Sequence, residues 1–100
     1  FGRGPKILWE PPWNGGRSHY GKCFSAVVAG GGFKGGRVIG ASNENGTEVQ
    51  QRPVYPQDLL ASMYELLGID PDGPLPNSRG LKVQVMPSSK NSTGRLKEIM

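Results

Sequence analysis

The feature that most constrains this chain is an apolar run that ends in a cluster of glycines. Cys23 to Ala29 is a continuous apolar segment, and five glycines follow it within Gly30–Gly36. A run of this form predicts a strand buried on both faces. The glycines predict a connection in which the backbone turns tightly or takes positive φ. His19, the one histidine of the chain, lies just ahead of the expected strand, and such an arrangement commonly builds part of an anion or metal site.

The composition predicts a loop-rich piece of a larger domain. Glycine and proline make up a quarter of the 100 residues, and hydrophobic residues only 35%, so we expect no large independent core. Arg37–Ala41 is predicted as a second short strand, followed by a tight turn at Asn45–Gly46. Leu81–Met86 is predicted as a late strand. With one helix between them, these strands fit the closing edge of an α/β domain.

One helix is predicted over residues 56–67. Pro56 suits a first helical position, and Asp58 lies in the first turn, where the helix dipole favours a carboxylate. Gly68 predicts a left-handed C-terminal cap. Five apolar residues at helical spacing predict the buried face, namely Leu59, Leu60, Met63, Leu66 and Leu67.

The charges alternate in three blocks that do not suit a nucleic-acid binder. Residues 1–42 carry about +5, residues 43–78 about −5 and residues 79–100 about +4. A uniformly basic binder would not hold an acidic middle third. No apolar run approaches the roughly 20 residues that cross a bilayer. Cys23 is the one cysteine; it allows no internal disulfide and is predicted to be a small buried residue.

Few residues near the start of the chain can carry chemistry. A neutral imidazole binds Zn²⁺ directly, but a closed zinc site needs three or four protein ligands, so His19 is either one ligand of a shared site or a surface histidine. Arg3, Lys6 and Arg17 cluster here and either grip an oxyanion or are solvated. The Gly30–Gly36 segment does not match the phosphate loop GxxxxGK[ST], because Lys34 is followed by glycine.

Several short motifs occur in a fixed order along nearly the whole chain. They are Phe1–Ile7, Gly16–Tyr20, Phe24–Gly36, Val38–Ser42, Pro53–Leu59, Leu67–Asp70 and Gly94–Ile99. In this order they resemble the C-terminal part of a large bacterial family filed as domain of unknown function 1501. That family is similar to the alkaline-phosphatase and sulfatase superfamily.

The resemblance implies an α/β sandwich whose other strands lie upstream of Phe1, with residues 1–100 as the C-terminal segment of one larger domain. In that superfamily, Asp, Glu and His side chains hold divalent metal ions, here zinc or calcium, that polarise a phosphate or sulfate ester. His19 matches the family histidine and is implied to be a metal ligand shared with residues outside this chain. The implied anion contacts are Arg3, Arg17 and Lys6, with loop backbone near the site from Gly30, Gly31 and Gly32.

Two residues depart from the family motif. Ser18 stands where the family usually has Asp, which removes a carboxylate able to ligate metal or to orient His19, and Tyr20 replaces Trp. Two functions therefore remain open: part of a metal-dependent phosphate- or sulfate-ester hydrolase, inactive as the 100-residue segment alone, or a non-catalytic relative acting as a binding or structural module. The implied partners are the remainder of the domain and the ester, without nucleic acid or a membrane span, in an exported or periplasmic setting.

Overall fold

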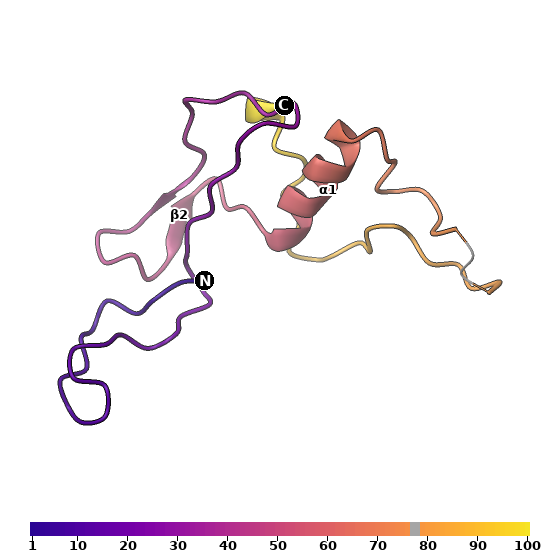
Figure 1. Ribbon diagram of the computed structural model, residues 1–100. Helices are drawn as coiled ribbons and strands as arrows, with labels where there is room; N and C mark the ends of the chain where they lie inside the picture. Colours follow the sequence, from indigo (N-terminus) through magenta and orange to yellow (C-terminus); the bar gives the residue numbers. More distant parts are fainter. Residues whose placement is uncertain (77–78) are drawn as a thin grey trace. The chain divides into compact units, whose positions relative to one another are not determined.

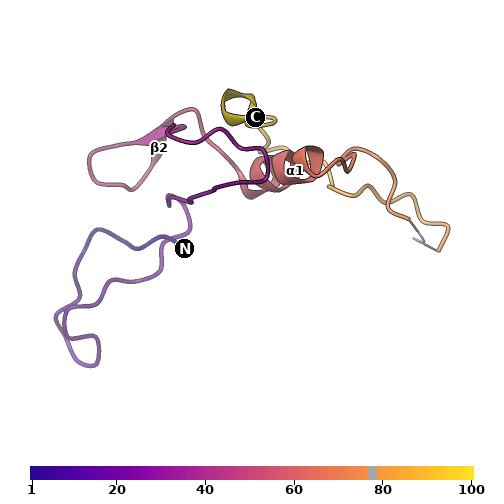
Figure 2. The same ribbon diagram turned by 45° about the horizontal axis from the view of Figure 1, so that its top comes forward.

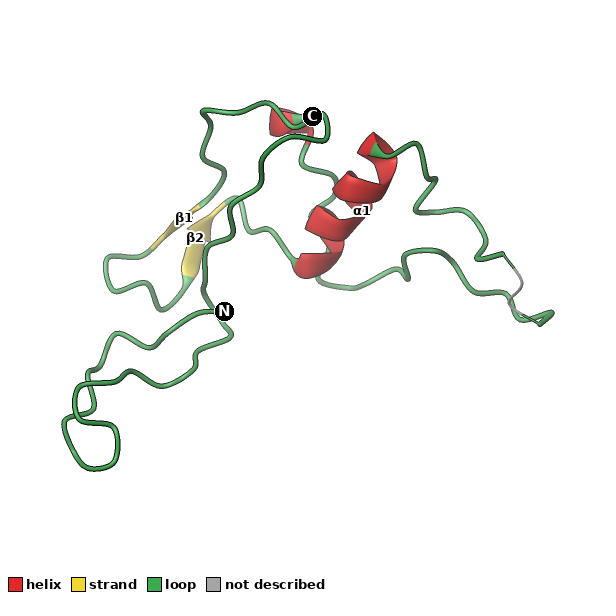
Figure 3. Ribbon diagram, viewed as in Figure 1, coloured by secondary structure: helices red, strands yellow, loops and turns green. Residues whose placement is uncertain are grey.

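The computed structural model describes residues 1–76 and 79–100 and divides the chain into two compact units. Unit 1 comprises Phe1–Val27 and Ile39–Pro53, and unit 2 comprises Val28–Val38 and Val54–Met100. The elements are strands β1 (Ala41–Ser42) and β2 (Val49–Gln51), helix α1 (Pro56–Leu66) and the 3₁₀ helix η1 (Lys97–Ile99) (Figures 1 and 3). The described chain is therefore mixed α/β with long loops.

Unit 1 contains a two-stranded ribbon made from the start of the chain. Arg3 and His19 face each other in an antiparallel bridge. Around this pair, Gly4 N donates to the Ser18 carbonyl at 2.9 Å, and Tyr20 N to the Gly2 carbonyl at 2.9 Å. Figures 1 and 2 both show the two segments side by side.

The second part of unit 1 is the β1–β2 hairpin. Ala41 pairs with Gln51 and Ser42 with Val49, with a register shift between the two pairs. The turn is stabilised by the Asn43 side chain, which accepts from Thr47 N at 2.8 Å and donates to Thr47 Oγ1 at 2.7 Å. The predicted turn at Asn45–Gly46 is confirmed.

The bounds of α1 follow the sequence signals closely. Pro56 occupies the first turn, and the Asp58 carboxylate accepts the Tyr55 backbone N–H at 3.0 Å. At the other end, Gly68 takes φ +78°. Gly68 N then donates to the Glu65 carbonyl at 3.0 Å and Ile69 N to the Tyr64 carbonyl at 2.9 Å. These two bonds form a Schellman motif, which ends the helix.

The face that α1 buries differs from the predicted one. Leu60, Met63 and Leu67 are exposed, whereas the buried residues are Asp58, Ala61 and Ser62. The reason is tertiary: the polar side chains bond to residues 92–96, which cover this side of the helix. Ala61 joins Leu96 and Ile99 as the buried apolar residues of the described chain.

The predicted strand at Cys23–Ala29 does not form. Val27 is 95% exposed, and no strand includes this segment. A run buried on both faces needs a neighbouring strand on each side, and the described residues place none there. The strand predicted at Arg37–Ala41 is also wrong in its bounds, because only Ala41 belongs to β1 and Val38 is 93% exposed.

The predicted strand at Leu81–Met86 is reduced to one bridge between Pro74 and Gln84. Leu75 N donates to the Val83 carbonyl at 2.7 Å and Val85 N to the Gly73 carbonyl at 2.9 Å, so the two segments do lie antiparallel. A longer ladder is prevented because the facing segment contains prolines, which have no N–H to donate.

Two smaller expectations have mixed outcomes. Cys23 is a free thiol, but it is half-buried rather than buried. Within residues 1–76 and 79–100, no helix is long and apolar enough to cross a membrane.

Candidate functional site

The ribbon in unit 1 brings together some of the predicted site residues. Arg3 and His19 form a non-hydrogen-bonded antiparallel pair, since the flanking residues make the ribbon bonds. Side chains of such a pair lie close together on the same face. Arg17 precedes His19 by two residues, so the alternation of side chains along an extended segment assigns it to that face as well. His19, Arg3 and Arg17 are all exposed.

A stack of side chains supports this face. The Phe1 and His19 rings lie 4.4 Å apart between centroids, at 51°. The Arg3 guanidinium carbon lies 4.9 Å above the Phe1 ring centroid, within the range of a cation–π contact. The same guanidinium donates to the Arg17 carbonyl at 3.0 Å. Arg3 thus spans both strands, and the Phe1 ring restricts the imidazole of His19.

The opposite face explains the glycines of the first motif. Gly2 and Gly4 are buried. A methyl group on Gly2 would collide with the carbonyl oxygens of Tyr20 and Cys23. The sequence Phe-Gly-Arg-Gly therefore alternates large exposed side chains with buried glycines, of which Gly2 admits no side chain.

Ser18 projects from the face opposite to His19. A methyl group on Gly4 would lie 3.3 Å from Ser18 Oγ, and successive residues of an extended strand alternate between faces. The side chain at position 18 is therefore directed away from the imidazole of its neighbour. In this ribbon an Asp at position 18 would not stand beside His19 on its own face.

The other predicted site residues are not brought into this cluster. Lys6 is exposed in the loop beyond the paired part of the ribbon. Gly30, Gly31 and Gly32 belong to unit 2, where their φ angles are +76°, +60° and +95°. The backbone after them is held by Lys34 N, which donates to the Ile99 carbonyl at 2.8 Å.

His19 is the candidate metal ligand of the ribbon. Across residues 1–76 and 79–100, no three His, Cys, Asp or Glu side chains gather closely enough to hold an ion. A neutral imidazole can occupy one coordination position of a metal ion.

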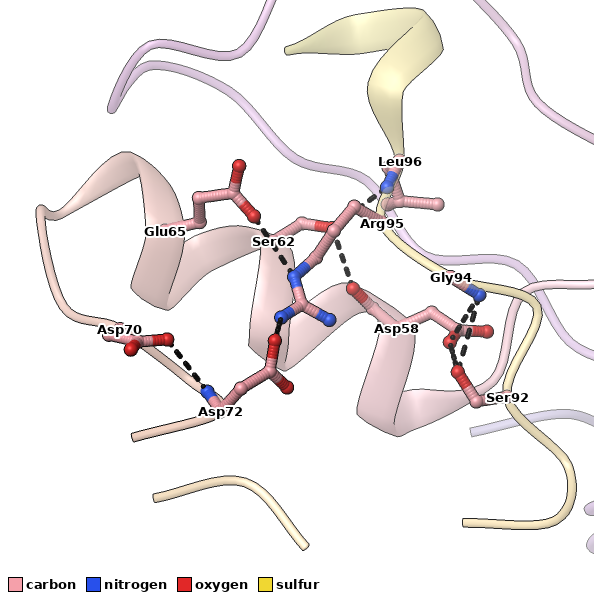
Figure 4. A network of polar contacts seen from close by, with 9 residues as sticks. All are labelled: Asp58, Ser62, Glu65, Asp70, Asp72, Ser92, Gly94, Arg95 and Leu96. Atoms are coloured by element: carbon pink, nitrogen blue, oxygen red, sulfur yellow. Dashed lines mark hydrogen bonds and ion pairs between the residues drawn. The ribbon is translucent and has the colours of Figure 1, made fainter. Parts of the chain in front are cut away.

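The sequence analysis missed a network of polar contacts around Asp58 in unit 2 (Figure 4). Asp58 is 1% exposed. Its carboxylate accepts from Ser92 Oγ at 2.6 Å, Thr93 N at 3.0 Å, Thr93 Oγ1 at 2.9 Å and Gly94 N at 3.1 Å. Burial alone raises the pKa of this carboxyl, but the hydrogen bonds from Ser92, Thr93 and Tyr55 outweigh burial and lower the pKa from 3.8 to about 2.

Two further contacts extend this network along α1. Ser62 Oγ accepts from Leu96 N at 2.9 Å and donates to the Asp58 carbonyl at 2.6 Å. The Arg95 guanidinium donates to Glu65 and Asp72, each at 3.0 Å (Figure 4). These contacts fasten residues 92–96, the closing segment, to α1.

A comparison with known families gives one result. The family profile described as "Protein of unknown function (DUF1501)" matches residues 1–94. The chain belongs to the DUF1501 family. The predicted family is confirmed, and the DUF1501 match includes the ribbon, the hairpin, α1 and the donors of Asp58. Neither a curated protein nor a solved structure matches the chain.

Proposed function

We propose that this DUF1501 chain is the C-terminal segment of a larger α/β domain of the alkaline-phosphatase and sulfatase type, and that it forms part of a metal-dependent phosphate- or sulfate-ester hydrolase. The observation that carries the proposal is the ribbon register, which pairs Arg3 with His19 and sets Arg17 on the same face. A cationic face beside one imidazole suits an anionic ester.

The roles of the three residues follow from their chemistry. His19 holds one coordination position through a neutral ring nitrogen. Arg17 is exposed and contacts the anionic oxygens of the ester, and Arg3 both contacts the anion and braces the ribbon through the Arg17 carbonyl. A zinc or calcium ion bound there would polarise the phosphoryl or sulfuryl group. The remaining ligands and the nucleophile come from residues outside the described ones.

The alternative is a non-catalytic relative that keeps the fold as a binding or structural module. The departure at Ser18 favoured this alternative, but residue 18 projects from the face opposite to His19. The loss of a carboxylate there leaves the cationic face intact. An exported or periplasmic location belongs to the main proposal and rests on the family resemblance alone.

The decisive measurement is the metal content of the purified parent protein, which contains this segment, by elemental mass spectrometry, with His19→Ala alongside. We expect near-stoichiometric zinc or calcium that falls by at least tenfold in the variant, since one ligand of a shared site is removed. Lys90→Gln, which changes an exposed cation in unit 2, is the matched control and should keep its metal. Absence of metal from both the natural protein and the control would favour the non-catalytic module.

A second measurement tests the anion contact by titrating inorganic phosphate into the same proteins. Arg17→Gln should weaken phosphate binding by about tenfold without loss of metal, because a charged hydrogen bond is removed. Equal phosphate affinity in Arg17→Gln and Lys90→Gln would remove Arg17 from the site.

A further inference from the structure

Both tryptophans of the chain lie on one loop of unit 1 and are open to solvent. Trp9 is 72% exposed and Trp13 58%, and Ile7 on the same loop is exposed as well. Large apolar side chains are usually covered in folded proteins, and several on one short loop mark an interaction site. We call Lys6–Gly16 the tryptophan loop.

The tryptophan loop has a defined backbone. Its base is closed by Leu8 N, which donates to the Gly16 carbonyl at 2.7 Å, and by Gly15 N, which donates to the Leu8 carbonyl at 2.8 Å. A turn at its tip is closed by Trp13 N, which donates to the Glu10 carbonyl at 3.0 Å. The indoles are therefore presented by an ordered scaffold, which reduces the entropy lost on binding.

The Trp9 indole also packs against the backbone of its own loop. A methyl group on Gly15 would lie 3.2 Å from Trp9 Cζ3, so the Trp9 ring rests against the backbone of Gly15. In the described part of the chain neither indole N–H donates to a protein acceptor. Each indole thus offers an apolar ring together with a free donor, the combination that places tryptophan at the boundary between hydrocarbon and water.

The residues on and next to the tryptophan loop carry a net positive charge. Lys6 and Glu10 lie within the loop, and Arg3 and Arg17 lie on the adjoining ribbon segments. Glu10 is the one acidic residue among residues 1–42. Basic side chains beside exposed tryptophans complement an anionic lipid surface, where each Lys or Arg adds to the attraction.

We infer that the tryptophan loop docks on anionic lipid bilayers, with the indoles at the headgroup level and the neighbouring cations on the lipid phosphates and carboxylates. This inference does not require the proposed hydrolase function, because the indoles lie outside the proposed anion site and lipid binding needs no metal, although Arg3 and Arg17 are shared by the two proposals.

Intrinsic fluorescence tests the inference directly, because the loop contains all the tryptophan of the chain. The purified protein is titrated with vesicles of phosphatidylcholine containing phosphatidylserine, and with vesicles of phosphatidylcholine alone. We expect the emission to move to shorter wavelength on the anionic vesicles only, and the shift to weaken as salt is raised. Co-sedimentation with the same vesicles measures the partition coefficient.

Variants separate the two contributions. Trp9→Ser and Trp13→Ser should each lower the partition coefficient by at least tenfold, and Lys6→Gln by about fivefold. Leu67→Ala, which removes an exposed apolar side chain from unit 2, is the matched control and should bind as the natural protein does. Circular dichroism of each variant confirms that it keeps the native fold.

Three results would overturn the inference. The first is emission that is already at short wavelength without vesicles, which means that protein covers the indoles. The second is equal binding to the two kinds of vesicle. The third is a spectral shift with a single-stranded oligonucleotide and none with anionic vesicles, which assigns the loop to nucleic acid.

Discussion

Asp58 shows how one residue can join parts of the chain that are far apart in sequence. Its carboxylate is bonded to residues 34 to 36 positions further on, and also to the Tyr55 N–H at the start of the helix. The bonds to backbone donors stabilise the charged form of the carboxylate. Asp58 therefore serves at once as a helix cap and as a tertiary contact.

The lowered pKa of Asp58 makes stability depend on pH in acid. The pKa is 3.8 before folding and about 2 afterwards, so the charged form contributes about 2 kcal/mol of stability that is fully present above pH 3.8. This contribution is lost as the pH falls through about 2. Urea unfolding between pH 5 and pH 2 should show the decline in the natural chain and not in Asp58→Asn.

Asp58→Asn should also be less stable at neutral pH by about 2 kcal/mol, because the donors of residues 92–94 lose their charged acceptor. Glu44→Gln removes an exposed carboxylate from the hairpin and is the control that should keep both the stability and its acid dependence. A decline in acid that persists unchanged in Asp58→Asn would assign it to other carboxylates.

Among the elements, α1 depends most clearly on one backbone conformation. Gly68 takes φ +78° with open space where a Cβ would stand. Gly68→Ala should therefore cost about 1 kcal/mol through backbone strain alone. Urea unfolding followed by circular dichroism measures the cost.

The matched control for this element is Gly35→Ala. Gly35 also has open space around a Cβ, but it does not take positive φ. Its substitution should be neutral or slightly stabilising, because alanine restricts the unfolded chain. Equal destabilisation by the two substitutions would show that the left-handed cap is not what matters.

The elements that could be predicted from the sequence are those whose bounds depend on residues close by in the chain. Pro56 and Gly68 set the ends of α1 without help from the rest of the protein, and the Asn45–Gly46 turn is likewise local. The buried face of α1 could not be predicted, because periodicity counts apolar residues and Asp58 and Ser62 are buried by distant partners. Cys23–Ala29 was predicted as a strand on its apolar content, but a strand also needs neighbours.

In the candidate site too, the residues could be identified from the sequence, whereas their arrangement could not. His19, Arg3 and Arg17 were singled out by residue type and by the family motif, and their common face follows from a pairing register that the sequence does not state. In the structure, the backbone at Gly2 lies against the carbonyl oxygens of Tyr20 and Cys23, and only glycine fits there. The order of residues in the motif does not show that the side chain at position 18 is directed away from His19, because that direction follows from the alternation of side chains along the paired strand.

At the scale of the whole molecule, a destabilising substitution in one unit should leave hydrogen exchange in the other unit unchanged. All described bonds of the Asp58 side chain lie within unit 2. In Asp58→Asn, hydrogen exchange of the Leu96 amide, which bonds Ser62, should accelerate by about tenfold or more. The amides of Gly4 and Tyr20 in the ribbon should keep their rates, and equal acceleration there would show that the units unfold as one.

The contacts of residues 92–96 with α1 should hold this segment in place even after the chain is cut by a protease. Residues 92–96 are held to α1 by hydrogen bonds rather than by the exposed stretch at residues 87–91 that precedes them. A single proteolytic cut in that stretch would leave the last residues in place, and the nicked protein would migrate as one species until denaturant releases the peptide. The last residues could then be supplied as a separate synthetic peptide, carrying isotope labels or a fluorophore, to a chain that lacks them.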